Sequence, residues 1–203
     1  MDKPYKNSGL FSDHYLSDIL PNLNVWQVDQ AELAQSRDKI KTIYQKTKTE
    51  LPNLSESALE ERFIRPILRA LNHVYEVQPT LTSTAEGMKK PDYAFFESKN
   101  GRTEAEKFAG KEEYFKKSLA LGEAKQWGRP LDKKLKTVKD PFEVQNPSLQ
   151  MSRYLWLTGT KWGILTDGQF WRLYERETSK RIDIYYEINL SALLENGTVN
   201  DFK

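Results

Sequence analysis

The hydrophobic pattern in the first quarter of the chain predicts one surface helix behind an irregular arm. Residues 1 to about 24 mix aromatic side chains with turn-forming residues and show no sustained period, so we expect an arm that packs on the main body. From residue 29 to about 50, apolar side chains recur at near-helical spacing with charged residues between them. Such spacing is typical of a helix with one buried face, here made by Leu33, Ile40 and Tyr44.

A second helix is predicted after Pro52, over the sequence SESALEERFIRPILRALN. Its apolar side chains form one stripe at four-residue steps: Leu59, Phe63, Ile67 and Leu71. Pro66 lies inside this stretch and has no backbone N–H to donate. We therefore expect the helix to bend there, or its ladder of hydrogen bonds to open.

The rest of the chain predicts a sheet. Aromatic or aliphatic alternation indicates strands at 74–78, 92–96 and 118–125, and the polar segment 101–117 between the last two is expected to be a helical or mobile insertion. Helical periodicity returns after Pro147, residues 161–176 read as a hairpin around Asp167 and Gly168, and 181–190 adds a final strand. This order predicts an α/β domain with a central mixed β-sheet flanked by helices.

The amino-acid composition limits the kinds of functional site that the chain can form. The 203 residues suit one principal core, and a net charge of +2 gives no global field to hold a polyanion. The chain has no cysteine and only two histidines, which excludes disulfides, thiolate nucleophiles and zinc sites that need sulfur. No run of about 18 apolar residues and no basic-then-apolar leader occurs, so we expect a cytoplasmic protein with no membrane partner.

Two short motifs carry the candidate chemistry: Pro91-Asp92 at the start of one predicted strand and Glu123-Ala124-Lys125 at the end of the next. Alternation along a strand puts Glu123 and Lys125 on one side, and Asp92 meets them there if the strands pair. Two converging carboxylates repel each other unless a cation lies between them, and oxygen ligands favour Mg²⁺. The lysine can orient a water or stabilise charge on a phosphate under attack, as phosphodiester hydrolysis requires. A Glu-x-Lys triplet alone is common in a chain with 30% charged residues, and the upstream Pro-Asp pair strengthens the prediction.

Five motifs follow one another along the chain, and the resemblance that they carry covers about residues 10–195: ESALEERFIRPILRALN, PDYAFF, LGEAKQW, QMSRYL and WGILTDGQFWRLY. In this order they resemble the nuclease domain of PD-(D/E)XK restriction endonucleases. The likeness is closest to the amino-terminal domains of type IIG and type IIL restriction-modification enzymes and to the nuclease region of type I motor subunits. The resemblance implies that Asp92 and Glu123 bind Mg²⁺, or Mn²⁺ in its place, that the carbonyl of Ala124 assists, and that Lys125 positions the water. It also implies a Q-x-x-x-Y element, Gln150 and Tyr154, beside the site and near the DNA backbone.

Two assignments stay open within this resemblance. A glutamate on the early helix often completes such a site, and Glu56 fits the family's spacing to Ile64 and Pro66 better than Glu60 does, although either could be a solvated helix charge. Asp92 and Glu123 are also thirty-one positions apart, longer than a plain hairpin needs. Were Asp92 misplaced, Glu97 would be the next acid.

A basic segment follows the predicted catalytic strand. Residues 125–139 carry six cationic side chains against the single acid Asp132. Such a run beside a cleavage site would bind duplex phosphates without regard to sequence, whereas the alternative is a solvated loop. The expected nucleic-acid contacts are Lys125, Arg129, Lys133, Lys134 and Lys136.

We expect three parts: an amino-terminal arm and helix packed on the core (1–50), the nuclease domain (51–195) and an exit segment to further domains (196–203). By resemblance the function is a metal-dependent endodeoxyribonuclease of a restriction-modification enzyme acting on double-stranded DNA. Methyltransferase and target-recognition domains in the same polypeptide, and transient dimerisation for double-strand cleavage, are further implications. The alternative is a noncatalytic DNA-binding or docking module on the same fold, and a third reading is a nuclease that acts outside restriction.

Overall fold

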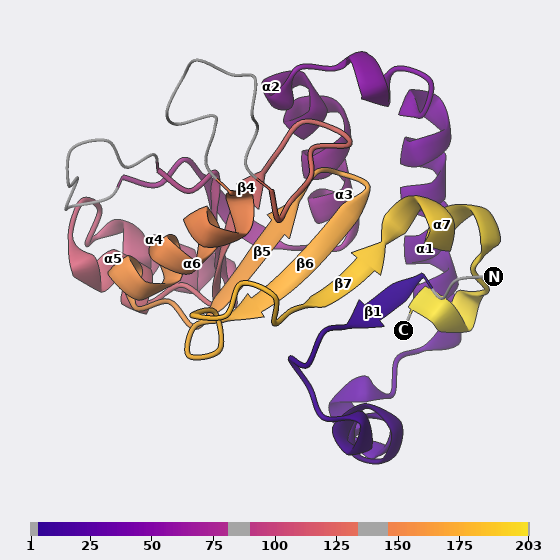
Figure 1. The fold of residues 1–203 in the computed structure, drawn as a ribbon, viewed down its shortest axis with the longest axis horizontal. Helices are drawn as coiled ribbons and strands as arrows, with labels where there is room; N and C mark the ends of the chain where they lie inside the picture. The colour runs from indigo at the N-terminus through magenta and orange to yellow at the C-terminus, as the bar shows by residue number, and fades with distance from the viewer. Residues whose placement is uncertain (1–3, 81–89, 134–145, 203) are drawn as a thin grey trace.

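A seven-stranded mixed sheet organises the computed structural model, which describes residues 4–80, 90–133 and 146–202 (Figure 1). In spatial order the strands are β1 (Tyr5–Asn7), β7 (Tyr186–Asn189), β6 (Phe170–Glu175), β5 (Trp162–Thr166), β4 (Ala120–Ala124), β3 (Tyr93–Phe96) and β2 (Val74–Val77). Among these neighbours, β4 and β5 form the one parallel pair and the other pairs are antiparallel. The predicted α/β class with a central mixed sheet is therefore confirmed.

The parallel pair forms because a helix carries the chain back between its strands. This crossover helix is α6 (Pro147–Thr158). The side chain of Asn146 caps it by accepting hydrogen bonds from the amides of Ser148 and Leu149, and Pro147 occupies the first turn, where its missing N–H has no cost. The β5–β6 hairpin then turns at Asp167 and Gly168, and Gly168 takes a φ of +86° that suits glycine.

Helices cover both faces of the sheet (Figure 1). One face packs against α1 (Gln30–Thr47), α7 (Leu190–Asn196) and a bent helix composed of α2 (Glu56–Leu59), η5 (Glu60–Ile64) and α3 (Arg65–Ala70). The other face packs against α4 (Lys99–Glu106), α5 (Glu112–Lys116) and α6. The remaining helices are short: η1 (Tyr15–Ile19), η2 (Leu20–Asn22), η3 (Asn24–Trp26), η4 (Leu51–Asn53) and η6 (Val199–Phe202).

The bent helix confirms the irregularity expected at Pro66. Its middle turn, η5, is a π-helix that ends just before the proline. A π-turn accommodates an extra residue, so the side chains beyond it move round the helix axis. Ile64 and Leu68 accordingly share the buried face with Ile67, whereas Leu71 lies beyond the end of α3 and is 43% exposed. The prediction that Leu71 belongs to the buried stripe was wrong.

The arm and the ends of the described chain pack onto the same body. The buried residues of α1 are the predicted Leu33, Ile40 and Tyr44. The short strand β1 pairs with β7, which the sequence pattern did not indicate, and the insertion after β3 is helical, as α4 and α5. Phe202, in the expected exit segment, packs against the core cluster shared by α1 and α3. In the described ranges, no helix combines the length and apolar character needed to cross a membrane.

Candidate functional site

Pairing of β3 with β4 brings the two predicted carboxylates together. Tyr93 lies opposite Gly122, so Asp92, just before β3, faces the end of β4. The backbone N–H of Ala124 donates to Asp92 Oδ2 at 2.8 Å. The long connection between the strands leaves their register intact, and the alternative acid Glu97 follows the other end of β3 with an exposed side chain. Asp92 is thus the acid that meets β4.

The Lys125 side chain lies on the same side of the sheet as Glu123, as strand alternation predicted. Lys125 Nζ donates to Glu123 Oε1 in a close ion pair, and the Glu123 side chain is only 2% exposed. The backbone N–H of Lys125 donates to the carbonyl of Thr166 at 2.7 Å, which extends the parallel pairing by one residue. The lysine is therefore fixed from both its main chain and its side chain.

The electrostatics of this cluster favour a bound cation. Burial, and then the negative charge of Glu123, raise the pKa of Asp92 to about 8, while the Ala124 amide and the charge of Lys125 oppose that rise. Burial, the largest single cause, would lower the pKa of Lys125, but the charges of Glu123, Glu56 and Asp92 and the hydrogen bond to Glu123 together outweigh it, and the pKa is raised. A carboxyl group with such a pKa is partly protonated at neutral pH unless another positive charge approaches. The donor set therefore suits a hard cation.

The number of side-chain ligands is small. Over residues 4–80, 90–133 and 146–202, no group of three or more His, Cys, Asp or Glu residues is gathered as a metal centre. A metal at this position would rest on Asp92 and Glu123, with main-chain and water oxygens completing its shell. Mg²⁺ commonly keeps several waters and one or two carboxylates, so the residues present fit that ion.

Gln150 and Tyr154 lie one turn apart on α6, which packs on the same face of the sheet as Leu121, two residues before Glu123. Gln150 Nε2 donates to the hydroxyl oxygen of Tyr154 at 2.8 Å, and that hydroxyl donates to the carbonyl of Lys90 at 3.2 Å. Burial, and then the negative charges of Glu123 and Asp92, raise the pKa of Tyr154. The Q-x-x-x-Y element is therefore close to the acids, and Tyr154 is 1% exposed.

The two helix acids occupy different environments. Ser55 caps α2, and Glu56 follows it on the exposed side, from which its charge acts on Lys125 and Arg129. Glu60 is buried in the π-turn, accepts a 2.5 Å hydrogen bond from the Tyr93 hydroxyl and lies 3.5 Å from Arg65 Nη2. Its charge also contributes to the raised pKa of Asp92. Both acids border the site, but Glu60 is already bound to protein groups.

Sequence reasoning missed the structural role of Asp167, which follows β5 beside β4. Its carboxylate is 2% exposed and accepts hydrogen bonds from the amides of Gln169 and Phe170, at 3.0 and 2.7 Å. Burial raises its pKa to about 6, and the amide of Gly128 is one of the groups that oppose the rise. The Asp-Gly pair signalled a turn, but nothing in the pattern indicated that the turn holds the segment that follows Lys125.

The basic segment is only partly within the described residues. Arg129 Nη1 donates to the carbonyls of Pro130 and Lys133, at 3.0 and 3.1 Å, and burial lowers its pKa. The side chain of Lys133 is exposed. Lys134 and Lys136 lie outside the described residues, so the expected cluster remains a prediction.

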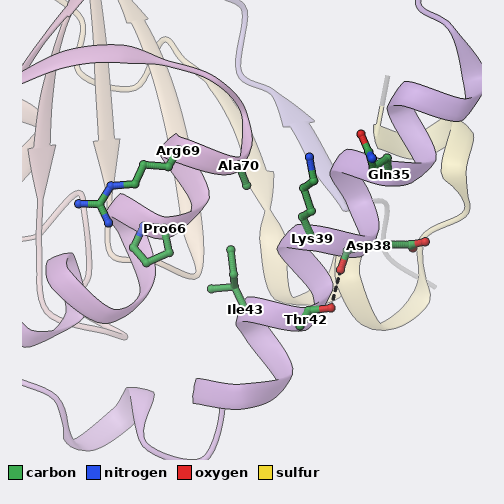
Figure 2. Close-up of a pocket in the computed structure, with 8 residues that line it drawn as sticks. All are labelled: Gln35, Asp38, Lys39, Thr42, Ile43, Pro66, Arg69 and Ala70. Atoms are coloured by element: carbon green, nitrogen blue, oxygen red, sulfur yellow. Dashed lines mark hydrogen bonds between the residues drawn. The ribbon is translucent and has the colours of Figure 1, made fainter.

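A surface groove lies elsewhere on the described part of the chain. It has a volume of about 660 Å³ and runs between α1 and α3 (Figure 2). Ile43, Pro66 and Ala70 form its apolar part, and Lys39 and Arg69 stand at its sides. None of the predicted site residues lines it. The candidate chemistry therefore belongs to the ends of β3 and β4.

Comparisons with protein-family models, curated proteins and solved structures found no match to the chain.

Proposed function

We propose that this protein is a metal-dependent endodeoxyribonuclease with a PD-(D/E)XK restriction-endonuclease-like fold, which hydrolyses phosphodiester bonds of double-stranded DNA. The observation that carries the proposal is the convergence of Asp92, Glu123 and Lys125 at neighbouring ends of β3 and β4. The raised pKa of Asp92 supports it, because a buried carboxylate pair of this kind gains most from a divalent cation.

The order of elements is a second support. A bent helix, three antiparallel strands, the crossover helix α6 and a parallel strand follow one another along the chain. The resemblance seen in the sequence implies this arrangement around the acids. The broader context that goes with it, namely restriction-modification, linked methyltransferase and target-recognition domains, transient dimerisation and a cytoplasmic location, is part of the same proposal.

Each residue has a distinct task in this proposal. Asp92 and Glu123 would hold Mg²⁺, or Mn²⁺, with the carbonyl of Ala124 in support. The bound ion supplies Lewis-acid polarisation and lowers the pKa of a bound water. Lys125 holds its proton, because its pKa is raised, and so acts as a hydrogen-bond donor to the attacking water or to a phosphate oxygen.

One observation favours the alternative, a noncatalytic DNA-binding or docking module. Lys125 already neutralises Glu123, and a protonated Asp92 would leave the cluster stable without any metal. Such a module would keep the basic segment and bind DNA in the absence of divalent ions.

Plasmid cleavage separates the two functions. Wild-type protein with Mg²⁺ should nick or linearise supercoiled DNA, and Asp92→Ala, Lys125→Ala and added EDTA should each reduce the rate by about a hundredfold or more. Glu97→Ala is the matched control, because it removes an exposed acid near the same strand. Salt-sensitive DNA binding without cleavage, unchanged in Asp92→Ala, would instead establish the docking module.

A further inference from the structure

Asp92 precedes β3, and several hydrogen bonds fix the chain around it. Its own carbonyl accepts the amide of Gln78 at 2.8 Å, and its Oδ2 accepts the amide of Ala124 at 2.8 Å. A third bond lies two residues earlier, where the carbonyl of Lys90 accepts the hydroxyl of Tyr154. This third bond comes from α6, on the far side of the sheet from the bent helix.

Pro91 makes the Lys90 carbonyl an effective point of attachment. Its ring fixes φ near −65° and also restricts the residue before it to extended conformations. Few torsions therefore separate the Lys90 carbonyl from the backbone of Asp92. A hydrogen bond that holds the Lys90 carbonyl in place therefore also limits the positions open to the Asp92 carboxylate.

Gln150 sets the direction of the Tyr154 hydroxyl. Its amide nitrogen donates to the phenolic oxygen at 2.8 Å, so the hydroxyl hydrogen is left for the Lys90 carbonyl at 3.2 Å. Gln150 is 9% exposed and Tyr154 is 1% exposed. The enclosed Tyr154 hydroxyl therefore uses both its acceptor and its donor in hydrogen bonds to protein groups.

We propose that Tyr154 is a positioning residue for Asp92, acting through the Lys90 carbonyl and oriented by Gln150. This assignment rests on the proposed function, because the group that it positions is the proposed metal ligand. It gives Tyr154 a role within the protein, whereas the resemblance implied only that the Q-x-x-x-Y element lies beside the site and near the DNA backbone.

The first test does not depend on catalysis. Tyr154→Phe removes one oxygen atom and keeps the ring, so the fold should remain intact. The amide of Ala124, which donates to Asp92, should then exchange with solvent deuterium about three- to tenfold faster in NMR spectra. Tyr174→Phe is the matched control, because Tyr174 is fully buried and shares a 2.8 Å hydrogen bond with Ser148. Unchanged exchange in Tyr154→Phe, or an equal change in Tyr174→Phe, would overturn the proposal.

The second test uses plasmid cleavage. Tyr154→Phe should raise the Mg²⁺ concentration for half-maximal activity by about three- to tenfold, with the KM for DNA unchanged. Gln150→Leu should give a smaller shift in the same direction, and the double variant should be no worse than Tyr154→Phe, because both residues act through one hydrogen bond. A raised KM for DNA with unchanged metal dependence would assign Tyr154 to the DNA backbone instead. Wild-type protein that does not cleave, together with faster Ala124 exchange in Tyr154→Phe, would refute the nuclease function and leave the positioning role standing.

Discussion

Replacing Asp92 by asparagine should remove a pH-dependent loss of stability. The pKa of Asp92 is about 8 in the folded chain, against an ordinary value of 3.8. The folded state therefore binds this proton more tightly than the unfolded state, and its contribution to stability is present at low pH and lost as pH rises from about 4 to 8. At 1.36 kcal/mol per pKa unit, the gap corresponds to a loss of up to about 6 kcal/mol. The asparagine side chain of Asp92→Asn would be neutral throughout and would escape this loss.

Urea unfolding between pH 5 and pH 9, in EDTA, measures the effect. The stability advantage of Asp92→Asn over wild type should grow by about 4 kcal/mol between pH 5 and pH 9, because the wild type loses about 1.5 kcal/mol of this contribution already by pH 5. Asp167, whose pKa is about 6, titrates in both proteins and cancels in the difference. Free-energy differences that stay constant with pH would refute the reasoning. Mg²⁺ at a hundred times its Kd should restore about 2.7 kcal/mol to the wild type at pH 8 and little to the variant.

Three other predictions concern the fold and the proposed DNA-binding surface. Gly163→Ala should lower the unfolding free energy by about 1–3 kcal/mol in urea titrations, because the added methyl group would press on buried side chains of α6. Tyr93→Phe should cost about 1–3 kcal/mol at pH 8, since Glu60 loses its short hydrogen bond while it stays buried; a change below about 0.5 kcal/mol would contradict this reading. Lys133→Ala should reduce the slope of log Kd against log salt for duplex binding by about 0.9, measured by fluorescence anisotropy, whereas Lys46→Ala on α1 should leave it unchanged.

The sequence was most informative where one physical cause determines the structure. The apolar spacing of Leu33, Ile40 and Tyr44 predicted α1 because a helix must bury one stripe, and strand alternation placed Lys125 beside Glu123 because side chains change sides at every residue. The missing N–H of Pro66 predicted an irregular turn in the same way.

Features that depend on tertiary contacts were not predictable. The strand β1 has three residues, too few for alternation to be visible, and forms because β7 offers a free edge. The exposure of Leu71 and the burial of Glu60 follow from the π-turn, whose presence was expected but whose effect on the helix register was not. The bond from Tyr154 to the Lys90 carbonyl joins segments 64 residues apart, and no local pattern signals it.

The pairing of β1 with β7 also constrains the order in which the domain folds. Tyr5 pairs with Ile188, so the two strands of this ladder lie far apart in the sequence and β1 is synthesised well before β7. The strands β2, β3 and β4, at the opposite side of the sheet from β1, need only contacts between closer segments. Closing a longer loop carries a larger entropic cost, and residues 5–7 have no partner in the sheet until the ribosome has released β7. Strand β1, although it is synthesised before the other described strands, is therefore among the last parts of the sheet to be completed.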